Sequence, residues 1–67
     1  MNINFINGIA TIKQGRKIVA KFFDRDVFFK NTKINYSKKY CLELPKFGVS
    51  TESNDLNELI NLLKKYI

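Results

Sequence analysis

The chain has 67 residues, of which 45% are hydrophobic and 27% are charged, with one proline and three glycines. This length allows one domain, close to the lower limit for burying an apolar core without disulfides or metals, and the composition excludes a disordered tail or a collagen-like repeat. Twelve Lys and Arg against six Asp and Glu give a formal net charge of +6, which either favours an anionic partner such as nucleic acid or only keeps the chain soluble.

The first 23 residues are expected to form a three-stranded meander. Alternation over residues 2–6 predicts a strand, and Asn7-Gly8 is a pair that takes the positive φ angles of a type I′ turn. Ile9–Gln14 is the second predicted strand, Gln14-Gly15-Arg16 a turn and Lys17–Phe23 the third strand. This third strand has apolar residues on both faces. A helix on one side and a partner subunit on the other would account for them, and so would a crowded core.

The middle of the chain starts with a charged break at Asp24-Arg25-Asp26. Val27–Lys30 is expected to resume a strand, residues 31–33 to turn, and residues 34–36 to follow as a short extended piece. Lys39–Leu44 is the next predicted strand. Because proline has no N–H to donate, Pro45 should end this strand or place it at a sheet edge. Lys46–Glu52 is expected to be a short extended or looping segment.

The last stretch, Ser53–Ile67, predicts one amphipathic helix. Its apolar residues recur at helical spacing, and they are Leu56, Leu59, Ile60, Leu63 and Ile67. Asp55 is the predicted N-cap, whose carboxylate accepts a bond from the amide of Glu58 while the Glu58 side chain reaches back. Leu62 and Tyr66 widen the apolar face, so we expect the helix either to fill an aromatic core or to reach a second subunit.

The sequence offers no catalytic or metal-binding constellation. It has no histidine, and Cys41 is its single cysteine, so neither an internal disulfide nor a Cys-His nucleophile can form. We expect Cys41 to be buried, Asp24 and Asp26 to be turn residues, and the protein to be no enzyme, with no cofactor and no metal. There is no apolar run of membrane-span length and no signal-peptide pattern at the start. A cytoplasmic location without a membrane partner is therefore expected.

The candidate residues for binding nucleic acid or another partner are basic. They form one group around the predicted hairpin tip and a second group further on, and they are Lys13, Arg16, Lys17, Lys21, Lys30, Lys33, Lys38 and Lys39. Aromatic residues interleave with them at positions 22, 23, 28, 29, 36 and 40. Sheets that bind single strands combine basic grooves with exposed rings. In so small a domain, the same rings are also needed for the core.

The second half of the chain carries a family resemblance. Residues 40–59 read YCLELPKFGVSTESNDLNEL, a tyrosine-led strand, a proline, a glycine-containing segment and a capped helix, with an amphipathic continuation at Leu63-Lys64. This order resembles the HicB-like antitoxin family, whose helix begins with G-D-T-x-E-E-A. Ser53, Asp55 and Leu59 stand where the family has Gly, Thr and Ala. The resemblance implies a sheet covered by one helix that binds a protein, commonly a small RNase toxin, and inhibits it by occupancy.

We therefore predict a single α+β domain over residues 1–67, with a small antiparallel sheet of four to six strands covered on one face by a C-terminal helix. Two functions stay open. One is a non-enzymatic regulatory or inhibitor protein that binds a protein partner, such as an RNase toxin or another nucleic-acid enzyme. The other is a small basic nucleic-acid-binding protein. A homodimer is expected in either case.

Overall fold

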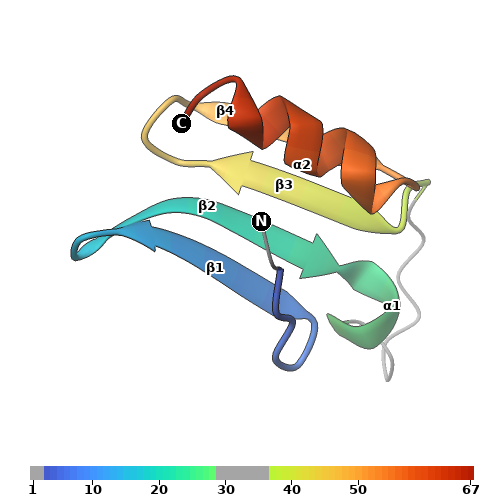
Figure 1. Cartoon of the computed structure of the whole chain (residues 1–67). Coiled ribbons are helices and arrows are strands. Elements are labelled where there is room, and N and C mark those ends of the chain that lie inside the picture. Colours follow the sequence, from blue (N-terminus) through green and yellow to red (C-terminus); the bar gives the residue numbers. More distant parts are fainter. Residues whose placement is uncertain (1–2, 29–36) are drawn as a thin grey trace.

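Four antiparallel strands form one sheet in the order β1-β2-β3-β4, and helix α2 lies across one of its faces (Figure 1). The structure is a computed structural model that describes residues 3–28 and 37–67. Its elements are β1 (Ile9–Gln14), β2 (Lys17–Asp24), α1 (Arg25–Phe28), β3 (Tyr40–Leu44), β4 (Val49–Ser53) and α2 (Leu56–Lys64). The predicted class, an α+β fold with an antiparallel sheet and a C-terminal covering helix, is confirmed with four strands.

The first predicted turn is confirmed, but it closes only a single bridge. The N–H groups of Ile6 and Ile9 donate to each other's carbonyl oxygens at 2.8 and 3.1 Å. Between them, Asn7 and Gly8 have φ angles of 54° and 81°, as both central positions of a type I′ turn require.

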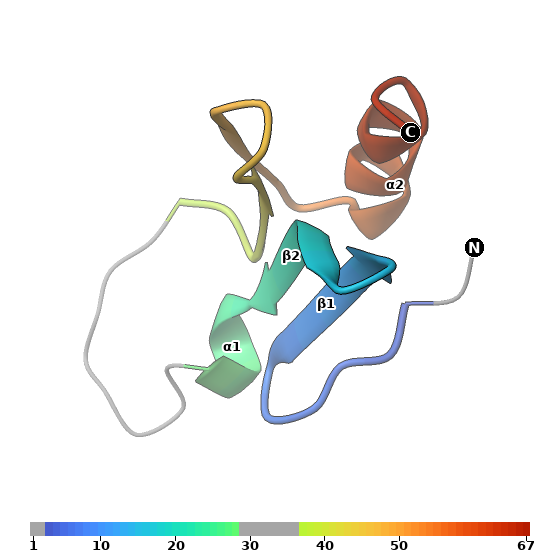
Figure 2. The same ribbon diagram turned by 90° about the vertical axis from the view of Figure 1, so that its left-hand side faces the viewer.

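The prediction of a strand at the start of the chain is wrong for residues 3–5. These residues lie on the same side of the sheet as α2 (Figure 2), where Ile3 and Phe5 pack against the core. The physical reason is that α2 covers mainly β3 and β4, which leaves the β1–β2 half of this face for other apolar side chains. Residue 2 lies outside the described residues. The β1–β2 hairpin itself is as predicted, with Gly15 at a φ of 65° in its turn.

The segment after β2 forms the short helix α1, so the prediction that Val27–Lys30 resumes a strand is wrong for Val27 and Phe28. The side-chain Oδ1 of Asp24 accepts a hydrogen bond from the N–H of Asp26 at 3.2 Å. Such a cap satisfies one of the free amides of a first helical turn and favours helix over strand. The predictions for residues 29–36 lie outside the described residues.

The strand β3 ends at Leu44, and Pro45 begins a turn, as predicted. The N–H of Phe47 donates to the carbonyl of Leu44 at 3.0 Å, and Gly48 has a φ of 67°. The segment Lys46–Glu52, which we expected to be extended or looping, holds this turn and most of β4. Because the turn reverses the chain, β4 pairs in register with the whole of β3.

Helix α2 begins after Asp55, the predicted N-cap, but it is shorter than the predicted Ser53–Ile67, and the capping partners differ. The Oδ1 of Asp55 accepts from the N–H of Asn57 at 3.0 Å rather than from Glu58. The Ser53 hydroxyl, buried at the end of β4, donates to the Glu58 carboxylate at 3.1 Å and accepts from the N–H of Asp55 at 3.0 Å. A buried hydroxyl needs such partners, so Ser53 takes the place of a reciprocal capping box.

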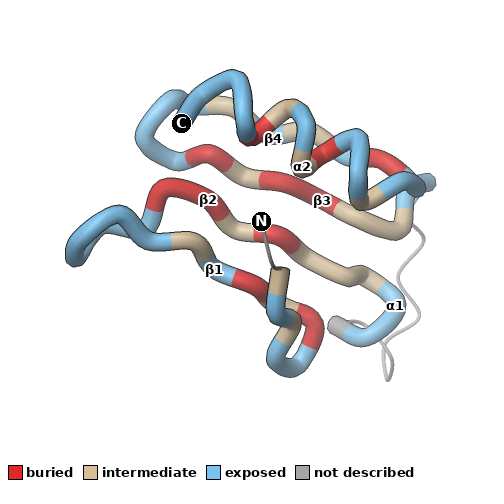
Figure 3. The backbone as a smooth tube through the Cα atoms, viewed as in Figure 1, coloured by how far each residue is buried: buried red, intermediate tan, exposed pale blue. Residues whose placement is uncertain are grey.

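The core lies between the sheet and α2 (Figure 3). Its largest fully buried side chains are Phe22, Leu42, Leu44, Leu59 and Leu63. Burying one side chain of this size contributes about 1.5–3 kcal/mol, which makes the α2 stripe a main source of stability. Cys41 is buried, as predicted.

Candidate nucleic-acid interface

The turn that joins β1 to β2 and the turn that joins β3 to β4 lie at one end of the molecule. Because every neighbouring pair of strands is antiparallel, the Gly15-Arg16 turn and the Pro45–Gly48 turn point the same way (Figure 1). Helix α2 ends there too, since the ring of Tyr66 lies 5.0 Å from that of Phe47, centroid to centroid. We call this region the turn end and define it as residues 13–18, 44–49 and 63–67.

Positive charge is concentrated at the turn end. Its residues, all of which the structure describes, include no Asp or Glu and the following bases: Lys13, Arg16, Lys17, Lys46, Lys64 and Lys65. The acids lie elsewhere. Glu43 is opposite Lys21 in the β2–β3 pairing, and the other five, Asp24, Asp26, Glu52, Asp55 and Glu58, are at the opposite end, around α1 and the start of α2. The net charge of +6 is therefore unevenly distributed, and one end of the molecule attracts anions.

A groove opens at the turn end between β2 and the β3–β4 turn. The β2–β3 pairing covers Lys21–Asp24 and does not extend to Lys17–Ala20, so the two strands separate towards the turns (Figure 1). The groove has a volume of about 460 Å³, and its lining consists of Gln14, Lys17, Ile18, Val19, Pro45 and Lys46. Its apolar lining comes from Ile18, Val19 and Pro45, while two lysines supply positive charge.

An irregularity in the sheet shapes this groove. Ile12 pairs with Ala20 while Lys13 pairs with Ile18, so Val19 is the extra residue of a β-bulge. A bulge bends the strand and increases its local twist. The bend accompanies the separation of β2 from β3, and it leaves Val19 2% exposed and Ile18 37% exposed.

Two aromatic rings lie at the turn end, where Phe47 directly follows the groove residue Lys46. Phe47 is 41% exposed and Tyr66 39% exposed, and their rings are tilted by 46° to each other. The Lys46 Nζ lies 5.9 Å from the centroid of the Phe47 ring. Of the aromatic residues singled out in the sequence, Phe22 is in the core and Tyr40 packs against it, while the side chains at positions 28, 29 and 36 lie outside the described part of the chain.

The structure brings together only some of the predicted binding residues. Lys13, Arg16 and Lys17 are exposed at the turn end. Lys21 lies within the sheet opposite Glu43. Lys30 and Lys33 lie outside the described residues, and Lys38 and Lys39 are at the opposite end.

Sequence reasoning missed Lys46 as a site residue. Lys46 lies across the groove from Lys17 although 29 positions separate them along the chain. A hairpin prediction around Pro45–Gly48, from the Pro and Gly flanked by extended segments, could have placed it there.

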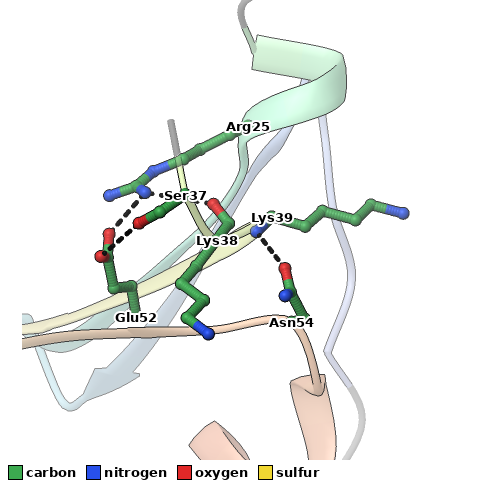
Figure 4. A network of polar contacts seen from close by, with 6 residues as sticks. All are labelled: Arg25, Ser37, Lys38, Lys39, Glu52 and Asn54. Carbon is green, nitrogen blue, oxygen red and sulfur yellow. Dashed lines mark hydrogen bonds and ion pairs between the residues drawn. The ribbon is translucent and has the colours of Figure 1, made fainter. Parts of the chain in front are cut away.

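Lys38 and Lys39 take part in a polar network that joins α1, residues 37–39 and β4 (Figure 4). The Nη1 of Arg25 donates to Glu52 at 2.6 Å and to the carbonyl oxygen of Lys38 at 3.1 Å. The Lys39 N–H donates to the Asn54 side chain at 2.9 Å. The Lys39 Nζ lies 3.9 Å from an Asp26 oxygen. The pKa of Lys39 is raised first by a side-chain hydrogen bond with Tyr40 and then by the negative charge of Asp24. Acids therefore already balance the charge at this end.

The ion pair between Arg25 and Glu52 shifts the pKa of both side chains. The pKa of Glu52 is lowered from its ordinary value because the carboxylate accepts hydrogen bonds from Arg25 and then from Ser37. The pKa of Arg25 is raised, mainly by the same bond to Glu52. Both side chains are partly exposed. The contact connects α1 to β4 and is structural.

The fold and the site together define a small α+β protein with a basic, partly aromatic end. Comparisons of the chain with protein-family models, with curated proteins and with solved structures gave no match. The resemblance to HicB-like antitoxins thus stays a prediction. The residues that carry it lie in β3, in the Pro45–Gly48 turn and in α2 with its N-cap. Over residues 3–28 and 37–67, there is no helix long and apolar enough to cross a membrane and no metal-binding cluster of acids and cysteine.

Proposed function

We propose that the protein binds single-stranded nucleic acid at the turn end. The observation that carries this proposal is the concentration of six bases and no acid at the turn end, where two of them, Lys17 and Lys46, line a groove that also has an apolar lining. Lys13, Arg16, Lys17 and Lys46, on the two turns, contact phosphates. Phosphate contacts supply most of the affinity of non-specific binding to nucleic acid.

The apolar lining favours a single strand over a duplex. Bases in a duplex are stacked and paired, whereas an unpaired base can place its face on an apolar surface or an aromatic ring. The groove beside Ile18 and Pro45, with the half-exposed ring of Phe47 next to it, offers such surfaces. We propose no base-specific recognition. A cytoplasmic location belongs to the same proposal.

The experiment is fluorescence anisotropy of a labelled oligonucleotide, measured as a single strand and as a duplex over a series of salt concentrations. We expect binding that is tighter for the single strand and weakens as salt rises. Absence of binding at low ionic strength, where phosphate contacts are strongest, would overturn the proposal. Equal affinity for both forms would remove the role assigned to the apolar lining.

A second candidate function is inhibition of a protein partner that has an acidic surface. The observation in its favour is that four of the exposed large hydrophobic residues lie at the turn end, at positions 18, 47, 66 and 67. An apolar centre with a charged rim is typical of protein interfaces. A photo-crosslinking residue in place of Phe47 separates the two functions in cells. A reproducible protein adduct that is lost on mutation of Lys17 supports inhibition, and adducts with nucleic acid alone exclude it.

A further inference from the structure

The outer edge of β4 has no strand paired with it in the part of the chain that the structure describes. β4 is the last strand of the sheet, and among the described residues it pairs with β3 alone. Proteins protect such edges with lysine, proline or a bulge. The sequence of β4, Val-Ser-Thr-Glu-Ser, contains neither residue, its register with β3 is regular, and its one charge, Glu52, is held by Arg25. The edge is therefore suited to pairing with another strand.

A shallow groove runs beside this edge, between β4 and α2. It has a volume of about 300 Å³, and its lining consists of Thr51, Glu52, Glu58, Leu59, Asn61, Leu62 and Lys65. Leu62 packs against the core but stays partly exposed along this groove. An added strand would thus meet backbone groups at the edge and an apolar side chain above it.

We propose that a second copy of this chain occupies the edge, pairing β4 with β4 in antiparallel fashion about a two-fold axis at Thr51. This register places Val49 opposite the partner's Ser53, and Ser50 opposite the partner's Glu52. No like charges face each other, which a cross-strand pair requires. The two sheets then form one continuous sheet, with the same patch used by both copies, as two-fold symmetry demands.

The position of α2 fits this pairing. Helix α2 packs on both β3 and β4, so its axis lies over the space between these two strands. The axis is thus set back from β4 by about half of the ~4.8 Å spacing between strands. Two such helices, on either side of a new β4–β4 ladder, lie roughly 10 Å apart, which is the usual distance for packed helices. The half-buried Leu62 side chains meet near the two-fold axis and fill the groove.

Charge on α2 is self-complementary about the same axis. Glu58 is close to Ser53, to whose hydroxyl it is hydrogen-bonded, and Lys65 lies seven residues later, two helical turns away on the same side. Both line the groove. In the antiparallel dimer, Glu58 of each copy faces Lys65 of the other. Glu52 and Glu58 also lower the positive charge at this face, so two chains of charge +6 repel each other less here than at the turn end.

The experiment measures self-association by sedimentation over a range of protein concentrations, without nucleic acid. K65E should weaken the dimer about tenfold, because it turns two symmetric attractions into repulsions. The matched control K64E changes the same charge on the neighbouring residue, outside the groove, and should leave association within about twofold. The double variant E58K/K65E restores opposite charges across the axis and should recover association. Thermal unfolding verifies that each variant is folded.

Hydrogen exchange gives a second readout that does not depend on these variants. Amides of Val49–Ser53 should exchange more slowly as protein concentration rises. A monomer at every concentration, equal weakening by K64E and K65E, or protection that maps away from β4 would each overturn the proposal. The dimer uses Val49 and Lys65 of the turn end but leaves Lys13, Arg16, Lys17 and Lys46 free. Its failure therefore says nothing against nucleic-acid binding by these four residues, and the reverse holds too.

Discussion

Replacing Lys17 and Lys46 together by alanine tests the turn end most directly, because these two residues are the bases that line the groove. Four bases on the turns, contacting one phosphate each, predict a slope of about −2.8 for log affinity against log salt on a single strand, at about −0.7 for each contact. K17A/K46A leaves two contacts and a slope of about −1.4. Because two fewer contacts release counterions, the variant should bind about sixty-fold more weakly than the wild type at ~0.05 M salt and about tenfold more weakly at ~0.2 M salt.

The matched control is K38A/K39A. It also removes two positive charges, which lowers the net charge from +6 to +4, but it does so at the opposite end of the molecule. Acids already surround Lys39, so this variant should keep nearly the full slope. Anisotropy titrations at four or more salt concentrations measure both slopes. If the two double variants lose affinity and slope equally, binding follows net charge alone and is not located at the turn end.

Three further predictions concern the fold. Leu63→Ala should lower the free energy of unfolding by about 2–5 kcal/mol in urea titrations, because Leu63 is fully buried and leaves a cavity; an effect under about 1 kcal/mol would contradict its core role. The lowered pKa of Glu52 predicts a stabilisation that is present above the ordinary pKa of 4.5 and lost as pH falls through the folded-state value. Melting temperatures should therefore show a smaller loss on acidification for Glu52→Gln than for the wild type. Gly15→Ala should cost about 1 kcal/mol from backbone strain alone, because φ is 65° and no atom lies within 4 Å of an added Cβ; Gly15→Asn should cost less, and equal costs would argue against strain.

Local patterns were sufficient for several parts of the fold. The helical stripe of α2 as far as Leu63 and the N-cap at Asp55, the Asn7-Gly8 turn and the end of β3 at Pro45 follow from spacing, φ preference and a missing N–H, which act within a few residues. Ile67, the last residue of the predicted stripe, lies beyond the helix and is exposed. Where a competing contact came from further away, prediction failed. Glu58 binds Ser53 rather than closing a capping box, and residues 3–5 cover the core instead of extending the sheet.

Composition and local patterns are enough to show that the chain is basic, lacks histidine and has a C-terminal amphipathic helix that needs a sheet to cover. They also place Lys13, Arg16 and Lys17 together at one hairpin tip, since a tight turn joins them. That Lys46 joins this group, and that Lys38 and Lys39 do not, depends on the three-dimensional arrangement of the strands. The reason is that side chains far apart in sequence meet according to strand order and direction, which depend on pairing across the whole sheet rather than on neighbouring residues.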